Sequence, residues 1–122
     1  MAKLDVVAAA GPGFATAESQ EPAQADVSVC RSADGSPVTG LTDSDFEVWV
    51  SFSGNITGGV RAWILVVEKV ASGLGPDGYY AIAFRNGDGD STWGPPGVWF
   101  VEIVVKAGSD TGQTLAAFDL PS

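Results

Sequence analysis

The stretch that most constrains the fold is an aromatic and β-branched run over residues 98–106, which follows the turn sequence Gly94-Pro95-Pro96-Gly97. A shorter version of the same pattern occurs earlier, where Gly75-Pro76-Asp77-Gly78 leads into residues 79–85. Glycine and proline favour turns, and aromatic and β-branched residues favour strands. Both runs are therefore predicted to be strands that enter the centre of a β-sandwich.

Turn signals divide the rest of the chain into further short segments with strand-like alternation. Residues 60–70 are largely apolar on both faces and are predicted to form one central strand. No segment has a convincing helical pattern. The predicted fold class is all-β, a single antiparallel sandwich of seven to eight strands over residues 25–122, preceded by an N-terminal strand and extended arm over residues 1–24. The predicted strands are residues 3–10, 25–31, 46–52, 60–70, 79–85, 98–106 and 113–120.

Three segments of the chain resemble the immunoglobulin-like modules of bacterial surface proteins and phage structural proteins. They are Asp34-Gly35-Ser36-Pro37-Val38-Thr39-Gly40-Leu41, Asp45-Phe46-Glu47-Val48 and Gly97-Val98-Trp99-Phe100. The resemblance covers roughly residues 25–120 and implies an immunoglobulin-like sandwich of the kind that decorates filaments, tails, capsids or cell surfaces. Cys30 is the only cysteine, so the resemblance is to the branch without a disulfide. Alternation places Cys30 opposite Val27 and Val29, as a half-buried and inert thiol.

Charge and composition exclude several classes of function. Fifteen acidic residues against six Lys and Arg give a net charge of −9, so the field of the protein repels nucleic acids and anionic lipids. No apolar run has the length of a membrane span. The sequence contains no histidine, which removes the Ser-His-Asp and Cys-His mechanisms. Strand carboxylates such as Glu47, Glu68 and Glu102 are expected to face solvent, and we do not expect an enzyme.

Alternation along residues 98–106 leaves two apolar faces. Trp99 is expected in the core with Val101, Ile103 and Val105, while Val98, Phe100 and Val104 share the opposite face. In a two-layer sandwich the core explains only one of these faces. The second face is predicted either to contact another subunit or to be covered by the N-terminal arm, residues 1–24, which would strap subunits together in an assembly. The favoured function is a non-catalytic structural or adhesive subunit whose partners are copies of itself or other assembly proteins.

The alternative is a binding module for carbohydrate or Ca²⁺. Trp93 lies in a predicted loop, where an exposed indole could stack on a sugar together with Tyr79 and Tyr80. Asn86, Asp88 and Asp90 place oxygen ligands at alternate positions of a glycine-rich loop, as a weak Ca²⁺ site would require, although no closing glutamate follows. No other cofactor is expected. The first residues lack an adequate signal-peptide core, which favours cytoplasmic synthesis followed by incorporation into an assembly.

Overall fold

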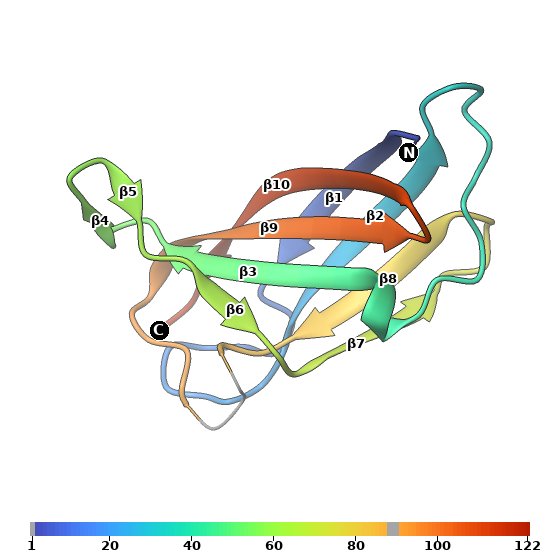
Figure 1. Cartoon of the computed structure of the whole chain (residues 1–122). Helices are drawn as coiled ribbons and strands as arrows, with labels where there is room; N and C mark the ends of the chain where they lie inside the picture. The colour runs from blue at the N-terminus through green and yellow to red at the C-terminus, as the bar shows by residue number, and fades with distance from the viewer. Residues whose placement is uncertain (1, 88–90) are drawn as a thin grey trace.

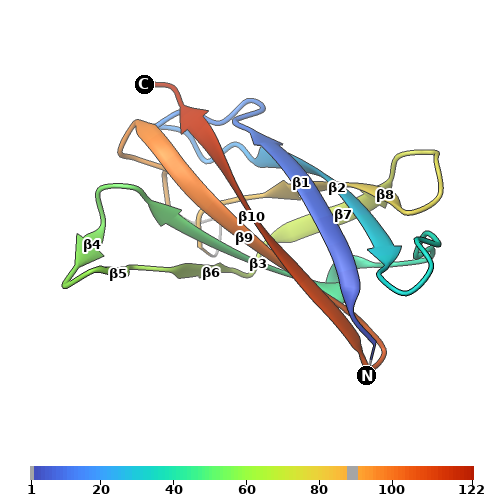
Figure 2. The same cartoon turned by 90° about the horizontal axis from the view of Figure 1, so that it is seen from above.

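The structure is a computed structural model that describes residues 2–87 and 91–122, and it consists of two packed antiparallel sheets (Figures 1 and 2). One sheet has the strand order β1-β2-β8-β7 and the other has the order β10-β9-β3-β6, while β4 and β5 form a separate hairpin. The predicted all-β, antiparallel sandwich class is confirmed. The elements are β1 (Leu4–Gly11), β2 (Ala23–Arg31), the 3-10 turn η1 (Asp43–Asp45), β3 (Phe46–Phe52), β4 (Ile56–Thr57), β5 (Val60–Arg61), β6 (Ile64–Val66), β7 (Lys69–Gly73), β8 (Tyr79–Phe84), β9 (Gly97–Ala107) and β10 (Asp110–Leu120).

The core lies between the two sheets and follows the alternation of the strands. Each strand that crosses the middle of a sheet buries every second side chain, because successive residues of a strand point to opposite faces. Burying a large apolar side chain completely contributes roughly 1.5–3 kcal/mol, so these rows dominate the stability. The fully buried residues include Val27, Val29, Val48, Val50, Ile82, Phe84, Trp99, Val101, Ile103 and Val105.

The prediction of one central strand over residues 60–70 is wrong. The segment is divided among β5, β6 and β7, and β6 pairs with β3 in one sheet while β7 pairs with β8 in the other. The chain crosses between the two layers at residues 67–68, immediately after the buried Val66. An apolar pattern on both faces arises here because the segment contributes to both sheets. It does not arise from a single strand covered on two sides.

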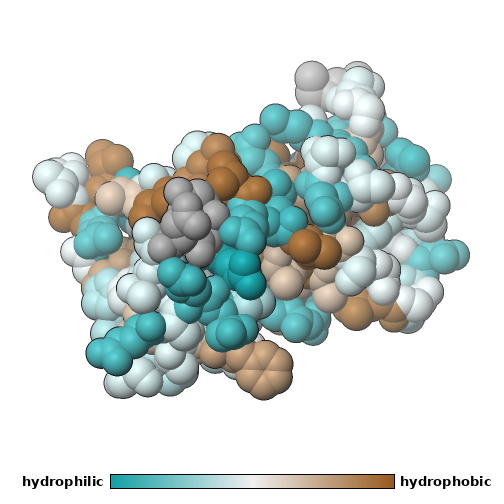
Figure 3. Space-filling model, turned by 90° about the horizontal axis from the view of Figure 1, so that it is seen from below, coloured by the Kyte–Doolittle hydropathy of each residue, from teal (hydrophilic) through white to brown (hydrophobic). Residues whose placement is uncertain are grey.

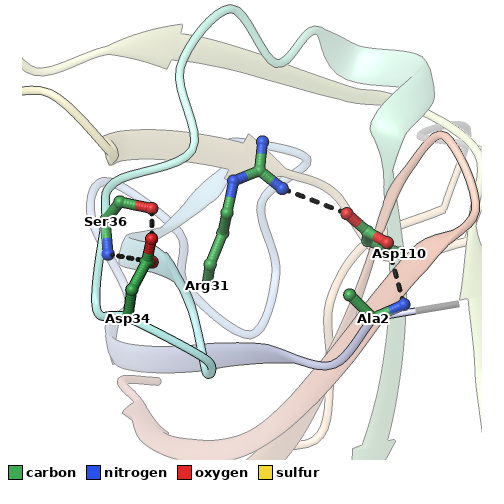
Figure 4. Close-up of polar contacts among 5 residues, drawn as sticks. All are labelled: Ala2, Arg31, Asp34, Ser36 and Asp110. Atoms are coloured by element: carbon green, nitrogen blue, oxygen red, sulfur yellow. Dashed lines mark hydrogen bonds and ion pairs between the residues drawn. The ribbon is translucent and has the colours of Figure 1, made fainter.

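The N-terminal strand is part of the sandwich. β1 pairs with β2 along its full length, and it meets the start of β10 through a parallel bridge between Lys3 and Thr111. Asp110 holds this corner together, because its Oδ1 accepts the Ala2 N–H at 2.9 Å while its Oδ2 pairs with Arg31 Nη1 at 3.0 Å (Figure 4). These contacts join the N-terminal end to the β9–β10 turn.

The segment between β1 and β2 is also held by its own chain. The Ala17 N–H donates to the Pro121 carbonyl at 2.8 Å, and the Ala17 carbonyl accepts the Gly94 N–H at 2.5 Å. The Trp93 N–H donates to the Ser19 carbonyl at 3.0 Å. The arm therefore packs against the C-terminal end and the β8–β9 connection. Within the described residues, no helix has the length and hydropathy that a membrane span requires.

Candidate interaction face

The outer surface of the β10-β9-β3-β6 sheet carries the residues that the sequence predicted as an interface. Residues that are directly opposite on paired strands point to the same side of a sheet, and the register places Phe100 between Ser51 and Ala117. Val104 lies between Glu47 and Gln113 in the same way. We call this surface the β9 face. Its residues are Glu47, Trp49 and Ser51 of β3, Leu65 of β6, Val98, Phe100, Glu102, Val104 and Lys106 of β9, and Gln113, Leu115, Ala117 and Asp119 of β10.

The β9 face exposes large apolar side chains from three strands. Val98 is 38% exposed, Leu65 is 41% exposed and Leu115 is 54% exposed, while Phe100 and Val104 are half-buried. The structure thus brings together the three predicted residues and adds Trp49, Leu65 and Leu115 to them. The alternation of residues 46–52 puts Trp49 on the side of β3 opposite the buried Phe46, Val48 and Val50. Leu115 could be assigned only from its register with Glu102.

Two successive polar side-chain contacts orient the indole of Trp49 on the β9 face. The Trp49 Nε1–H donates to Glu47 Oε1 at 2.7 Å, and Glu47 Oε2 lies 3.6 Å from Lys106 Nζ. The hydrogen bond from Trp49 lowers the pKa of Glu47 below its ordinary value, and the positive charge of Lys106 lowers it further. Partial desolvation raises the pKa, but by less than these effects lower it. Glu47 therefore stays ionised at neutral pH and keeps an acceptor in place for the indole.

The β9 face is close to electrically neutral on a strongly acidic protein. It carries the three acidic residues Glu47, Glu102 and Asp119 and the basic residue Lys106, and Arg61 of the neighbouring hairpin lies over it. Three acidic and two basic residues give this surface a net charge of −1, compared with −9 for the whole chain. Two copies of the protein would therefore repel each other only weakly through the charges of this surface.

Part of the β9 face is covered by the chain itself. The guanidinium carbon of Arg61, in β5, lies 3.8 Å from the centre of the Phe100 ring, which is the geometry of a cation–π contact. The cover at Phe100 therefore comes from the β4–β5 hairpin and not from the N-terminal arm, which bonds instead to the C-terminal end and the β8–β9 connection. Val98 and Leu115 remain exposed.

The three aromatic residues that were predicted to bind a ligand do not form one site. The expectation that Trp93 is exposed is wrong, because its side chain is only 1% exposed. Its indole packs edge-on against Trp99 and Phe118, and its Nε1–H donates to the Glu21 carbonyl at 2.7 Å. The loop that carries Trp93 folds over the end of the sandwich and fills the space between the sheets.

Tyr79 and Tyr80 point to opposite sides of β8. Tyr80 is buried, and its hydroxyl donates to the Val38 carbonyl at 2.6 Å and accepts the Leu41 N–H at 3.3 Å. It therefore anchors the connection between β2 and η1. Tyr79 is 49% exposed on the outer surface of the other sheet. A stacking platform made of Trp93, Tyr79 and Tyr80 is contradicted by this arrangement.

The predicted Ca²⁺ ligands can be followed only at Asn86, since Asp88 and Asp90 lie outside the described residues. The Asn86 amide donates from Nδ2 to the carbonyls of Thr92 and Trp93, each at 3.2 Å. These bonds close the loop across its base. Over residues 2–87 and 91–122, no group of three acidic or cysteine side chains is arranged to hold a metal ion.

Other exposed apolar side chains are dispersed. On the side of the molecule seen from below in Figure 1, hydrophobic side chains form separate spots divided by hydrophilic ones (Figure 3). Phe14 is exposed in the arm, and Val70 is exposed on the outer surface of the β1-β2-β8-β7 sheet. That outer surface otherwise consists largely of small and polar residues, including Ala9, Asp26, Ser28, Ser72, Ala81 and Ala83.

No protein-family model and no curated protein sequence matches this chain. Among solved structures, it is similar to AggA, the major subunit of aggregative adherence fimbriae type I from Escherichia coli. The two chains are 12% identical, the similarity covers 99% of this chain and 93% of that chain, and the TM-score is 0.30. A TM-score of this size is too low to establish a shared fold.

Proposed function

We propose that the protein is a non-catalytic structural subunit that assembles with further copies of itself through the β9 face. The observation that supports this most directly is the set of apolar side chains, Leu65, Val98 and Leu115, that remain exposed on a sheet whose other side already forms the core. Several exposed apolar side chains on one face are typical of interaction sites in soluble proteins. The sequence resemblance to immunoglobulin-like modules of surface and phage structural proteins is in keeping with such a role.

The size of the β9 face fits a contact between two subunits. Its four strands lie about 4.8 Å apart and rise about 3.3 Å per residue, and they contain 11, 11, 7 and 3 residues. The face therefore has a projected area on the order of 500 Å², which the relief of the side chains increases. A standard interface buries about 800 Å² on each partner, so the β9 face is comparable with a small one.

The composition of the face also suits a copy of the same chain. Two molecules of charge −9 repel each other, and a surface with a local charge of −1 adds little to this repulsion. In a two-fold arrangement each surface meets itself in reversed orientation. Glu102 of one copy can then approach Lys106 of the other, while the aromatic Trp49 supplies the kind of side chain that dominates interface energies.

Substitution of Leu115 by lysine tests this proposal. The side chain is 54% exposed, so Leu115→Lys should change the free energy of unfolding by no more than about 0.5 kcal/mol. A charge placed in an apolar contact should raise the dissociation constant of the assembly at least about tenfold, which corresponds to about 1.4 kcal/mol. Light scattering after size exclusion gives the mass of each variant across a concentration series.

Val70→Lys is the matched control. Val70 is 61% exposed on the outer surface of the other sheet, so the same change of charge occurs away from the β9 face. We expect Val70→Lys to assemble like the wild type. Equal weakening by both substitutions, or no weakening by Leu115→Lys, would contradict the assignment of the β9 face.

A further inference from the structure

The β4–β5 hairpin is attached to the sandwich by few contacts. It projects from one end of the molecule (Figures 1 and 2), and its residues 54–60 are all exposed. Within the described part of the chain, the hydrogen bonds of Ile56–Thr57 and Val60–Arg61 stay inside the segment 55–63. Arg61 of the hairpin contacts the sheet through the ring of Phe100.

Gly58 and Gly59 form the tip of the hairpin, and both have positive φ values, of 59° and 83°. This backbone conformation is open to glycine at little cost. Gly54 lies at the base, beside the ring of Phe52. A two-residue ladder that pairs only with itself is marginally stable in water, so the contact between Arg61 and Phe100 contributes to the position of the hairpin.

Two buried polar side-chain atoms, Ser51 Oγ on β3 and Arg61 Nε in the hairpin, have no hydrogen-bond partner within the described residues. Burying a donor without a partner is unfavourable. The buried Nε of Arg61 therefore opposes the ring contact that the same side chain makes with Phe100.

We propose that the β4–β5 hairpin is a flap over the β9 face, which covers Phe100 in the free subunit and moves aside when a second copy packs on that face. This inference rests on the proposed function. The partner's β9 face and the guanidinium of Arg61 compete for the same ring. Opening the flap also releases Arg61 Nε to water or to polar groups of the partner. The cover therefore weakens assembly by the fraction of time that the flap is closed.

The direction of the effect of Arg61→Ala separates the flap from a simple charge contribution. If Arg61 only supplied positive charge to the interface, its removal would weaken assembly. If it holds the flap closed, its removal should strengthen assembly, because the binding-competent state becomes more populated. An exposed cation–π contact corresponds to about a two- to fivefold equilibrium factor. Both subunits must open, so the dissociation constant should fall about four- to twenty-five-fold.

Two further variants control for charge. Arg85→Ala removes the same charge from a residue that pairs with Glu68 at 2.6 Å, outside the β9 face, and it should not tighten assembly. Arg61→Lys keeps the charge but loses the planar stacking group, so it should tighten assembly in the same direction as Arg61→Ala. It also keeps the test valid if the alanine variant proves unstable. The masses of all four proteins are compared by light scattering across a concentration series, after thermal melts have shown that each is folded.

Stronger assembly of Arg61→Ala and Arg61→Lys, with Arg85→Ala unchanged, supports the flap. If the wild type assembles and both Arg61 variants assemble equally or more weakly, the flap is overturned while the proposed function stands. If none of the four proteins assembles at any concentration, both the flap and the proposed function are overturned.

Discussion

Replacing Trp93 by alanine tests whether this residue belongs to the core or to a binding surface. The indole is 1% exposed and packs edge-on against Phe84, Trp99 and Phe118, with ring centroids 6.1, 5.4 and 5.7 Å away. Truncating a buried tryptophan to alanine costs about 3–5 kcal/mol. The lost bond from Nε1 to the partly buried Glu21 carbonyl adds to this cost.

We therefore expect Trp93→Ala to lower the free energy of unfolding by about 4 kcal/mol, which is a large part of the 5–15 kcal/mol that holds a typical domain together. Urea unfolding followed by far-UV circular dichroism measures this change without depending on the removed indole. Tyr79→Ala is the control, because Tyr79 is half exposed and its loss should cost no more than about 0.5 kcal/mol. A loss below about 1 kcal/mol for Trp93→Ala would refute the assignment of Trp93 to the core.

Three other substitutions test local features of the structure. Tyr80→Phe leaves the buried Val38 carbonyl without the hydroxyl that it accepts at 2.6 Å, so the free energy of unfolding should fall by about 1–3 kcal/mol; an unchanged urea midpoint would contradict this. Asp43 Oδ1 accepts the Ala71 N–H at 2.5 Å on β7, which is an edge strand. Because unpaired edge groups can pair with another chain, Asp43→Ala should aggregate at a lower temperature in light-scattering melts than Asp43→Asn, which keeps an acceptor. Equal aggregation temperatures would argue against protection of this edge by Asp43. The folded-state pKa of Glu47 is lowered, so the ionised side chain stabilises the protein above its unfolded pKa, and this stability is lost as pH falls through the lowered value. In thermal melts below about pH 4.5, Glu47→Gln should therefore lose less stability than the wild type as the pH falls. The same pH profile for both proteins would contradict this.

The strands whose signal is local could be predicted from the sequence. Residues 46–52 alternate between apolar and polar side chains, and β3 has the bounds Phe46–Phe52. β9 extends the predicted strand by one residue at each end. In both cases the buried row is the one that alternation indicates, because the period of two is a property of each strand by itself.

Features that depend on the arrangement of distant segments could not be predicted. Residues 60–70 cross between sheets, and only pairing with β3 and β8 shows where the crossing occurs. Trp93 follows a glycine-rich and acidic loop, which favours exposure, yet its burial depends on rings from β8, β9 and β10. A local pattern does not contain these contacts.

The β9 face was likewise predictable only where a local pattern was sufficient. Alternation along one strand was enough to put Val98, Phe100 and Val104 on one side. The addition of Leu115 required the register between β9 and β10, and the cover over Phe100 required the position of Arg61. The sequence therefore indicated one strand of the apolar surface outside the core, while tertiary structure determines how far this surface extends and which part is exposed.

The mass of the wild-type protein in solution tests the central claim most directly. Light scattering after size exclusion, over a concentration series from micromolar to millimolar, should give a mass that rises above the 12.5 kDa of one chain as the β9 faces of separate copies associate. A constant mass of 12.5 kDa across the whole series would contradict assembly through this face.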